Sequence, residues 1–312
     1  MSLQKSITAA FKTRAAPSLV AALIFVVVGS YGAFTSSDHA DEDAYIWASG
    51  YLMHQIVTVD TSGESHGRYA DPHWDPFTPW TLGMGTGTRL VYGLGLVLTP
   101  GTHAPGTPAY GHPTHIEETL PTPGTLRVER LLAVLCGAIG IGLIALRFRW
   151  AAVTAAVVML VLPHGITTFS RAWAEGPLLL GFGLCCLAYG TVWFAPALGA
   201  ALTFKLTALG LWPLVLFRRA RVLPLWQALV AMIGTFMLLT PSSLFFGGPL
   251  FIVKLIHFRV YAYGGQSPDG AFLPSRYFWP FELAAVLIGF EVVKRIVDAR
   301  RNRAVRPVVD EP

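Results

Sequence analysis

Apolar residues along this chain gather in long stretches separated by shorter polar segments. Six such stretches can be delimited, and five of them are 16 to 20 residues long. This length is typical of helices that cross a bilayer, because about 20 residues span a hydrocarbon core roughly 30 Å thick. The pattern predicts an all-α fold, a polytopic membrane helix bundle with about six full spans, at residues 17–34, 127–146, 151–163, 175–194, 222–239 and 278–293.

A further apolar stretch, residues 195–217, does not fit a single crossing. It follows a span that ends on the inner side, and it runs into Arg218 and Arg219, which should also lie inside. A broken helix that enters, turns near Lys205 and exits again satisfies both ends. Non-helical backbone at membrane depth is tolerated where it is buried in protein or lines a cavity. We therefore expect a re-entrant helix pair here.

The composition indicates that lipid surrounds part of the chain. The 312 residues are 53% hydrophobic and 13% charged, whereas soluble domains are about 25% charged. The charges are also segregated: residues 36–124 contain ten acids and two bases, and residues 294–306 contain six bases and one acid. Basic flanks stay cytoplasmic, so both termini are expected inside and the acidic loop outside. The net charge of +5 then reflects topology, and no nucleic-acid partner is expected.

This topology defines the regions of the chain and favours a compartment. The three cysteines lie in apolar stretches, which argues against a disulfide framework, and the single asparagine, Asn302, begins no glycosylation sequon. Both features favour a bacterial inner membrane. The regions are a cytoplasmic N-terminus (1–16), a transmembrane domain (17–298) that includes an outer loop (36–125) and a second outer segment (241–277), and a basic cytoplasmic tail (299–312).

The long outer loop contains two helical patterns. Asp38 can cap a helix in which Tyr45, Ala48 and Leu52 follow at helical spacing. Residues 76–98 are moderately apolar, and we expect a juxtamembrane helix that lies on or dips into the interface, with a full span as the alternative. The remainder is rich in Pro, Gly, Thr and His, as in irregular chain.

An acidic cluster, Asp41-Glu42-Asp43, follows the first span directly. Adjacent carboxylates raise each other's pKa, which suits a general base near neutral pH. A helix N-terminus has the opposite effect and favours the ionised form. The alternative interpretation is a solvated acidic helix start.

A second cluster in the loop contains His73 and Asp75 between prolines and aromatic residues, and these two side chains could orient a substrate. Seven of the nine histidines lie in the loop. None of their spacings matches a zinc pattern, so no metal ligand is assigned, and a divalent metal is left open.

Charged residues also occur at membrane depth or at its edge, where they are usually paired or functional. Arg171 and Glu175 are one turn apart and can pair with each other. Lys205 has no acid nearby in sequence, and its alternative role is to extend toward the surface. Arg259 and Arg276 fall on the outer side, where they suit a lipid phosphate as ligand or a plain headgroup contact.

In order along the chain, these motifs resemble those of the polytopic GT-C glycosyltransferases, especially the dolichyl-phosphate-mannose protein mannosyltransferase-like group. Residues 41–48 look like the family's acidic pair after the first span, and residues 71–77 loosely resemble its proline motif. Residues 170–175 resemble its Ser-Arg followed by an acid. Residues 199–205 are similar to its Gly-to-Lys stretch in short paired helices, and residues 276–280 to its Arg-Tyr-x-x-Pro.

The resemblance implies transfer of a hexose or pentose from a polyprenyl-phosphate donor to an acceptor, which is a protein, lipid or glycan, at the outer surface. Asp41 would be the base that deprotonates the acceptor, with Glu42 as its orienter or a second acid, and the sugar would be inverted. The pool of residues implied for binding donor and leaving phosphate is Tyr45, His73, Asp75, Arg171, Glu175, Lys205, Arg259 and Arg276.

Two other functions fit the same pattern. One is a non-catalytic membrane subunit, or inactive relative, that binds a partner in a membrane complex through its long outer loop. The other is a transporter or flippase, since charged residues in spans and broken helices also occur there. The chain shows no paired halves with matching broken segments.

Overall fold

The computed structural model describes residues 3–37, 85–99, 122–161, 164–214 and 223–240, with shorter pieces between 42 and 53 and between 285 and 300. Within these residues the regular structure is helical and contains no strand, which confirms the all-α prediction. The helices are α1 (Leu3–Thr35), α5 (Thr86–Leu98), α6 (Pro123–Phe148), α7 (Trp150–Val161), α8 (Gly165–Ser170), α9 (Glu175–Ala188), α10 (Phe194–Phe204), the 3-10 helix η3 (Leu206–Leu211) and α12 (Leu225–Leu239).

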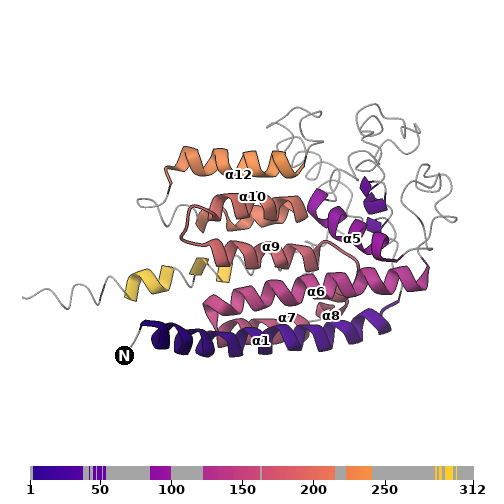
Figure 1. Cartoon of the computed structure of the whole chain (residues 1–312), viewed down its shortest axis with the longest axis horizontal. Coiled ribbons are helices and arrows are strands. Elements are labelled where there is room, and N and C mark those ends of the chain that lie inside the picture. The colour runs from indigo at the N-terminus through magenta and orange to yellow at the C-terminus, as the bar shows by residue number, and fades with distance from the viewer. Residues whose placement is uncertain are drawn as a thin grey trace, which may run out of the picture.

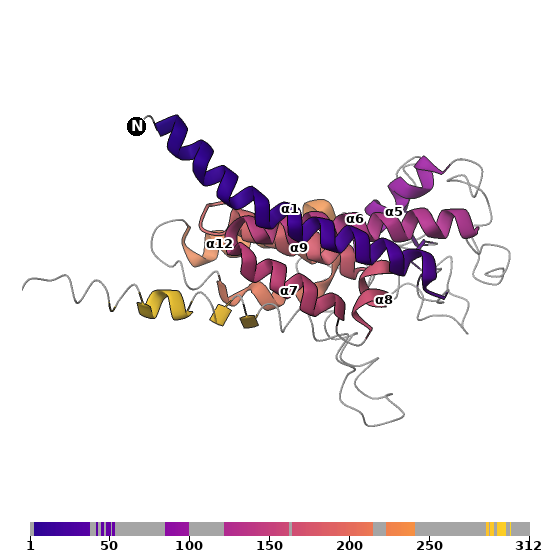
Figure 2. The same ribbon diagram turned by 90° about the horizontal axis from the view of Figure 1, so that it is seen from below.

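The long helices lie side by side with roughly parallel axes (Figures 1 and 2). Helix α6 is central, because it packs extensively against both α1 and α9, and α10 continues the array by packing against α9 and α12. Helix α5 lies across one end, against α6 and α10 (Figure 1). The same end holds the start of α6 and the end of α1. We call it the α5 end.

The bounds of α6 follow from its terminal residues. Thr122 caps the N-terminus: its Oγ1 accepts a hydrogen bond from the Thr125 amide at 3.2 Å, and Pro123 occupies the first turn, where no amide is needed. The helix ends at Arg149, whose φ of 54° is in the left-handed region. That conformation reverses the chain, and α7 begins at the next residue and runs back along α6 and α1.

Two described helices are long and apolar enough to cross a membrane, and this points to membrane association. They are the Ala15–Thr35 part of α1 and the whole of α6. Helices α7, α9, α10 and α12 are apolar but shorter, between 11 and 15 residues. The structure therefore supports two of the six predicted full spans by length. The second outer segment, 241–277, lies outside the described residues, as does most of the last predicted span, 278–293.

Helices α6 and α9 approach closely because glycines face each other between them. A Cβ at Gly140 would lie 2.3 Å from the Leu179 carbonyl oxygen, and one at Gly176 would lie 2.2 Å from the Ala133 carbonyl oxygen. Small residues of this kind allow helix backbones to meet, which increases van der Waals contact along the interface.

The stretch 195–217 contains a break at Lys205, where the sequence predicted a turn. Lys205 is extended, with φ −159° and ψ 138°, and it separates α10 from η3. The chain then returns toward the start of α10. This is shown by a small cavity of about 20 Å³, which Leu211 and Leu214 line together with Phe194 and Tyr189. Helix α10 and the segment after Lys205 thus form a hairpin whose tip is Lys205.

Replacing Gly140 by alanine should destabilise the bundle, because the new methyl group would collide with the Leu179 backbone. We expect a loss of about 1–3 kcal/mol, the usual range for overpacking. The matched control is Gly234→Ala in α12, where a Cβ meets nothing within 4 Å and better helix propensity should leave stability equal or higher. Thermal unfolding in detergent checks both, and equal melting temperatures for the two variants would contradict the close packing.

Candidate functional site

The most deeply buried ion pair among the described residues joins Glu42 to Arg130 at the α5 end. Arg130 Nε donates to Glu42 Oε1 at 2.8 Å, and its Nη2 donates to Oε2 at 2.7 Å. The carboxylate is fully buried and the guanidinium is 4% exposed. The backbone amide of Ala172 also donates to Glu42 Oε1, at 2.8 Å. Glu42 is thereby bound to α6 and to the segment that leads into α9.

Arg130 also holds the C-terminal end of α1. Its Nη1 donates to the carbonyl oxygens of Ala33 at 3.3 Å and Ser36 at 2.9 Å, and its Nη2 donates to that of Ser37 at 3.0 Å. The last carbonyls of a helix lack partners within the helix, and a cation there also complements the helix dipole. One side chain therefore connects α1, α6 and Glu42.

Arg171 lies beside this connection. Its Nη2 donates to the Ser37 carbonyl oxygen and to Ser37 Oγ, both at 3.4 Å. Its guanidinium carbon is 5.0 Å from the centroid of the Trp173 ring, a cation–π distance. Arg171 is thus held at the junction between α1 and the segment before α9, next to the Ala172 amide that binds Glu42.

Glu175 and Lys205 form a second ion pair at this end. Lys205 Nζ, at the tip of the α10 hairpin, donates to Glu175 Oε1. Glu175 begins α9, where the helix dipole favours an anion. The interpretation that Glu175 pairs with Arg171, its neighbour in sequence, is therefore wrong within the described residues. The alternative interpretation, in which the Lys205 side chain extends toward the surface, is also wrong, because this side chain is bound to the buried Glu175 and is only 24% exposed.

Helix α5 joins these parts. Tyr92 donates through its hydroxyl to the Trp173 carbonyl oxygen, and Thr88 Oγ1 donates to that of Phe204 at 2.9 Å. Arg89, 2% exposed, donates through Nε to the Ala48 carbonyl oxygen at 3.1 Å. Helix α5 thus contacts the hairpin tip, the lead-in to α9 and the short helical segment near residue 48.

Two features of α5 allow this contact. Gly85 precedes the helix with φ 43°, and a Cβ there would lie 2.3 Å from the Thr203 carbonyl oxygen, so only glycine suits both the backbone and the space. Burial raises the pKa of the Tyr92 hydroxyl well above its ordinary value, and the nearby carboxylates of Glu129 and Glu175 raise it further. Tyr92 therefore remains a neutral donor at physiological pH.

Glu129 is a buried carboxyl group that the sequence reading did not single out. It is fully buried on α6, and neither side-chain oxygen has a hydrogen-bond partner among the described residues. Its oxygens lie against α5 at Gly95, where a Cβ would be 2.5 Å from each. Such groups are rare because an unpaired buried polar atom is costly, and they are frequent at functional sites.

The structure brings together five of the predicted site residues at the α5 end: Glu42, Tyr45, Arg171, Glu175 and Lys205. The Tyr45 ring packs edge-on against that of Tyr92, with centroids 6.5 Å apart. The described residues contain no group of three or more His, Cys, Asp and Glu side chains placed to hold a metal. The other predicted site residues lie outside the described residues: Asp41, His73, Asp75, Arg259 and Arg276.

Sequence reasoning missed four residues of the site: Arg89, Tyr92, Glu129 and Arg130. A signal was present for the last two, because they are adjacent charges inside the apolar stretch 127–146, and charge within a span is usually paired or functional. Arg89 had a similar signal within residues 76–98. Tyr92 had none, since an aromatic residue on an apolar helix is ordinary.

Replacing Arg130 by methionine should cost about 3–5 kcal/mol of stability, because it leaves the buried Glu42 carboxylate without its cation. The double variant Glu42→Leu/Arg130→Met should recover much of the loss, since neither charge of the pair is then left buried without its partner. Arg127→Met is the control, as Arg127 is exposed on the same helix. Thermal unfolding of the four proteins checks this, and an Arg130→Met variant as stable as Arg127→Met would refute the role of the pair.

Replacing Gly95 by alanine should also destabilise the protein, by about 1–3 kcal/mol, because the methyl group collides with the Glu129 carboxyl group. Shortening that side chain removes the collision. The double variant Gly95→Ala/Glu129→Ala should therefore be more stable than the sum of the two single effects. Additive losses in a double-mutant cycle would show that the two residues are not in contact.

No family model, no curated protein and no solved structure matches the chain.

Proposed function

We propose that this protein is an integral membrane glycosyltransferase that moves a sugar from a polyprenyl-phosphate donor to an acceptor at the outer surface of a bacterial inner membrane. Both termini lie in the cytoplasm, and the α5 end faces outward. The bundle has about six full spans, with the α10 hairpin as a re-entrant pair. The acceptor is a protein, lipid or glycan, and the sugar is a hexose or pentose.

The exposed surface of the helices supports a membrane location. Only 28% of the most apolar stretch of α1 is buried. Large apolar side chains are also exposed on α7 and α12, for example Val158, Val161, Val230 and Leu238. Soluble monomers rarely expose apolar surface continuously, whereas lipid is as apolar as these side chains.

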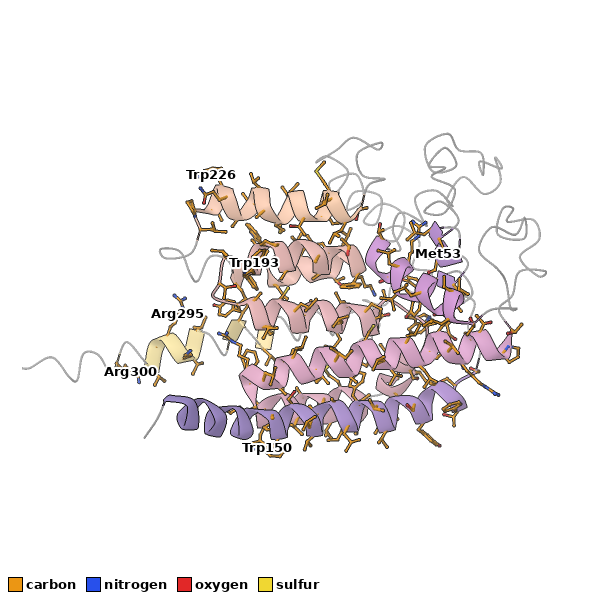
Figure 3. All side chains as sticks on the ribbon, in the orientation of Figure 1. Met53, Trp150, Trp193, Trp226, Arg295 and Arg300 are labelled. Atoms are coloured by element: carbon orange, nitrogen blue, oxygen red, sulfur yellow. The ribbon has the colours of Figure 1, made fainter. Side chains whose placement is uncertain are left out.

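The charges support the orientation. Among the described bases, Arg149, Arg295 and Arg300 are exposed toward the end opposite α5 (Figure 3), whereas only Arg127 is exposed at the α5 end. An excess of basic residues marks the cytoplasmic side.

The observation that carries the proposal is the convergence of three distant segments. Glu42, just after α1, accepts a hydrogen bond from the amide next to Arg171. Lys205, at the hairpin tip, pairs with Glu175, four residues beyond Arg171. The acid Glu42 and the cations Arg171 and Lys205 therefore lie at the same end of the bundle, which suits transfer from a lipid phosphate.

Glu42 acts here as a positioning residue. Both of its oxygens accept hydrogen bonds, so it is suited to hold the helix that contains it and not to take a proton from the acceptor. Asp41, which directly precedes Glu42 in the sequence, is the proposed base, and Glu42 is its proposed orienter. Pre-organised placement of this kind accounts for a large part of enzymatic rate enhancement.

The reaction is a single displacement. The Asp41 carboxylate accepts the proton of the acceptor hydroxyl, and the oxygen attacks the anomeric carbon of the donor. The bond between that carbon and the phosphate oxygen breaks, the lipid phosphate leaves with the electron pair, and the anomeric centre is inverted. The cations Lys205 and Arg171, together with Arg259 and Arg276, stabilise the charge that develops on the phosphate. His73, Asp75, Tyr45 and Glu175 complete the proposed donor and acceptor site.

Sugar transfer by the purified protein in lipid tests the proposal, with polyprenyl-phosphate mannose as donor and polyprenyl-phosphate glucose or a pentose donor in parallel. Release of polyprenyl phosphate is measured in the presence of membrane-extract acceptors. Asp41→Asn should lower the rate at least about 100-fold, because the base is lost. Lys205→Met should lower it by a similar factor through loss of charge stabilisation.

Lys294→Met is the control, because Lys294 is exposed and belongs to the basic C-terminal segment; its rate should equal that of the wild type. Rates are compared per folded protein, since Lys205→Met also removes an ion pair. An unchanged rate in Asp41→Asn would exclude Asp41 as the base. No transfer from any donor by folded wild-type protein would favour the non-catalytic subunit.

A further inference from the structure

Among the described residues, three tryptophans are exposed at the end of the bundle opposite α5. Trp150 begins α7, Trp193 directly precedes α10, and Trp226 is in the first turn of α12. Their exposed fractions are 58%, 68% and 63%. Figure 3 shows them toward one end of the bundle, on three separate elements. We call them the tryptophan girdle. Trp173, at the α5 end, is 8% exposed.

The connectivity explains why these residues share one level. Helix α6 ends and α7 begins there, α9 ends and α10 begins there, and α12 starts there (Figure 1). The segment after Lys205 also returns to this level, since Leu211 and Leu214 line the same small cavity as Arg147 and Phe148 at the end of α6. Three chain reversals or helix starts thus each present one indole to the surroundings.

Basic residues accompany the girdle. Arg149 is exposed at the C-cap of α6, directly before Trp150, and Arg147 is held with its guanidinium carbon 4.4 Å from the centroid of the Tyr189 ring. Arg295 and Arg300 lie toward the same end (Figure 3). The carboxylates among the described residues lie at the other end, so this end is suited to an anionic surface.

The surface between the girdle and the α5 end is apolar. Helices α7 and α12 contain no charged residue, and their exposed large side chains include Val157, Val158 and Leu238. The apolar part of α1, with 21 residues, is about 31 Å long at 1.5 Å per residue. That length matches a hydrocarbon core of roughly 30 Å.

We infer that the tryptophan girdle lies at the boundary between headgroups and acyl chains in the cytoplasmic leaflet, with Arg147 and Arg149 against anionic phospholipid headgroups. Indoles favour this boundary because they are apolar with one hydrogen-bond donor, and anionic lipids attract basic residues beside a span. The inference rests on the membrane location in the proposed function, and it assigns both the depth of the bundle and the chemistry of the lipid that it contacts.

Depth-dependent quenching tests the inference on the full chain. Cysteine is introduced separately by Trp150→Cys, Trp193→Cys, Trp226→Cys and Val158→Cys and labelled with the environment-sensitive fluorophore NBD. The wild type is the labelling blank, because Cys136, Cys185 and Cys186 are buried. Each protein is reconstituted in vesicles of phosphatidylcholine and phosphatidylglycerol at 3:1, with phosphatidylcholine spin-labelled at acyl position 5 or 12 as the quencher.

Labels at the three girdle positions should be quenched at least about twofold more by position 5 than by position 12, and the label at residue 158 should show the reverse. Girdle labels quenched by aqueous iodide and not by lipid, with residue 158 still quenched by lipid, would overturn the girdle but leave the membrane location intact. A label at residue 158 quenched only by iodide would overturn the membrane location itself. Girdle labels shielded from both quenchers, with crosslinked dimers, would show that a second copy covers this surface.

The contribution of the lipid charge has its own measurement. Adding phosphatidylglycerol to phosphatidylcholine vesicles should raise the melting temperature of the wild type, and Arg149→Gln should reduce that rise. The control is Arg149→Gln in vesicles of phosphatidylcholine alone, where its melting temperature should equal that of the wild type. Equal rises in the two proteins on adding phosphatidylglycerol would show that Arg149 does not contact anionic headgroups.

Discussion

The ion pair between Glu42 and Arg130 is the contact on which the rest of the α5 end depends. Removing two charges from water is costly, and the attraction between them compensates only when the remaining donors and acceptors are also satisfied. Here Arg130 also binds three carbonyl oxygens at the end of α1, and Glu42 also binds the Ala172 amide. One buried pair therefore sets the position of α1, α6 and the start of α9 relative to one another.

The α10 hairpin and α5 add the remaining side chains to that frame. The hairpin extends Lys205 to Glu175, and α5 covers the tip through Thr88 and binds the segment before α9 through Tyr92. Because the pair and the hairpin meet on either side of residues 171–175, this short segment is the centre of the site. The proposed transfer chemistry is assigned to this end because the cations Arg171 and Lys205 both contact the ends of this segment or belong to it.

Sequence patterns predicted the helices well and their contacts poorly. The apolar stretches 127–146 and 222–239 lie within or nearly within α6 and α12. The break at Lys205 followed from the inner end of the preceding span and from the arginines after the stretch. Pairing by sequence neighbourhood failed for Arg171 and Glu175. The partner of Glu175 lies 30 residues away, and only the return of the hairpin brings it near.

By itself, the sequence determined that the chain is helical, that it is rich in apolar surface and that acids and bases are segregated along it, because these properties depend on residue type and local period. The tertiary structure decided which charges meet. Glu42 and Arg130 are 88 residues apart, and Glu129 is buried against Gly95 only because α5 packs on α6. No local rule encodes such contacts, since they arise when separate helices close around the same buried volume.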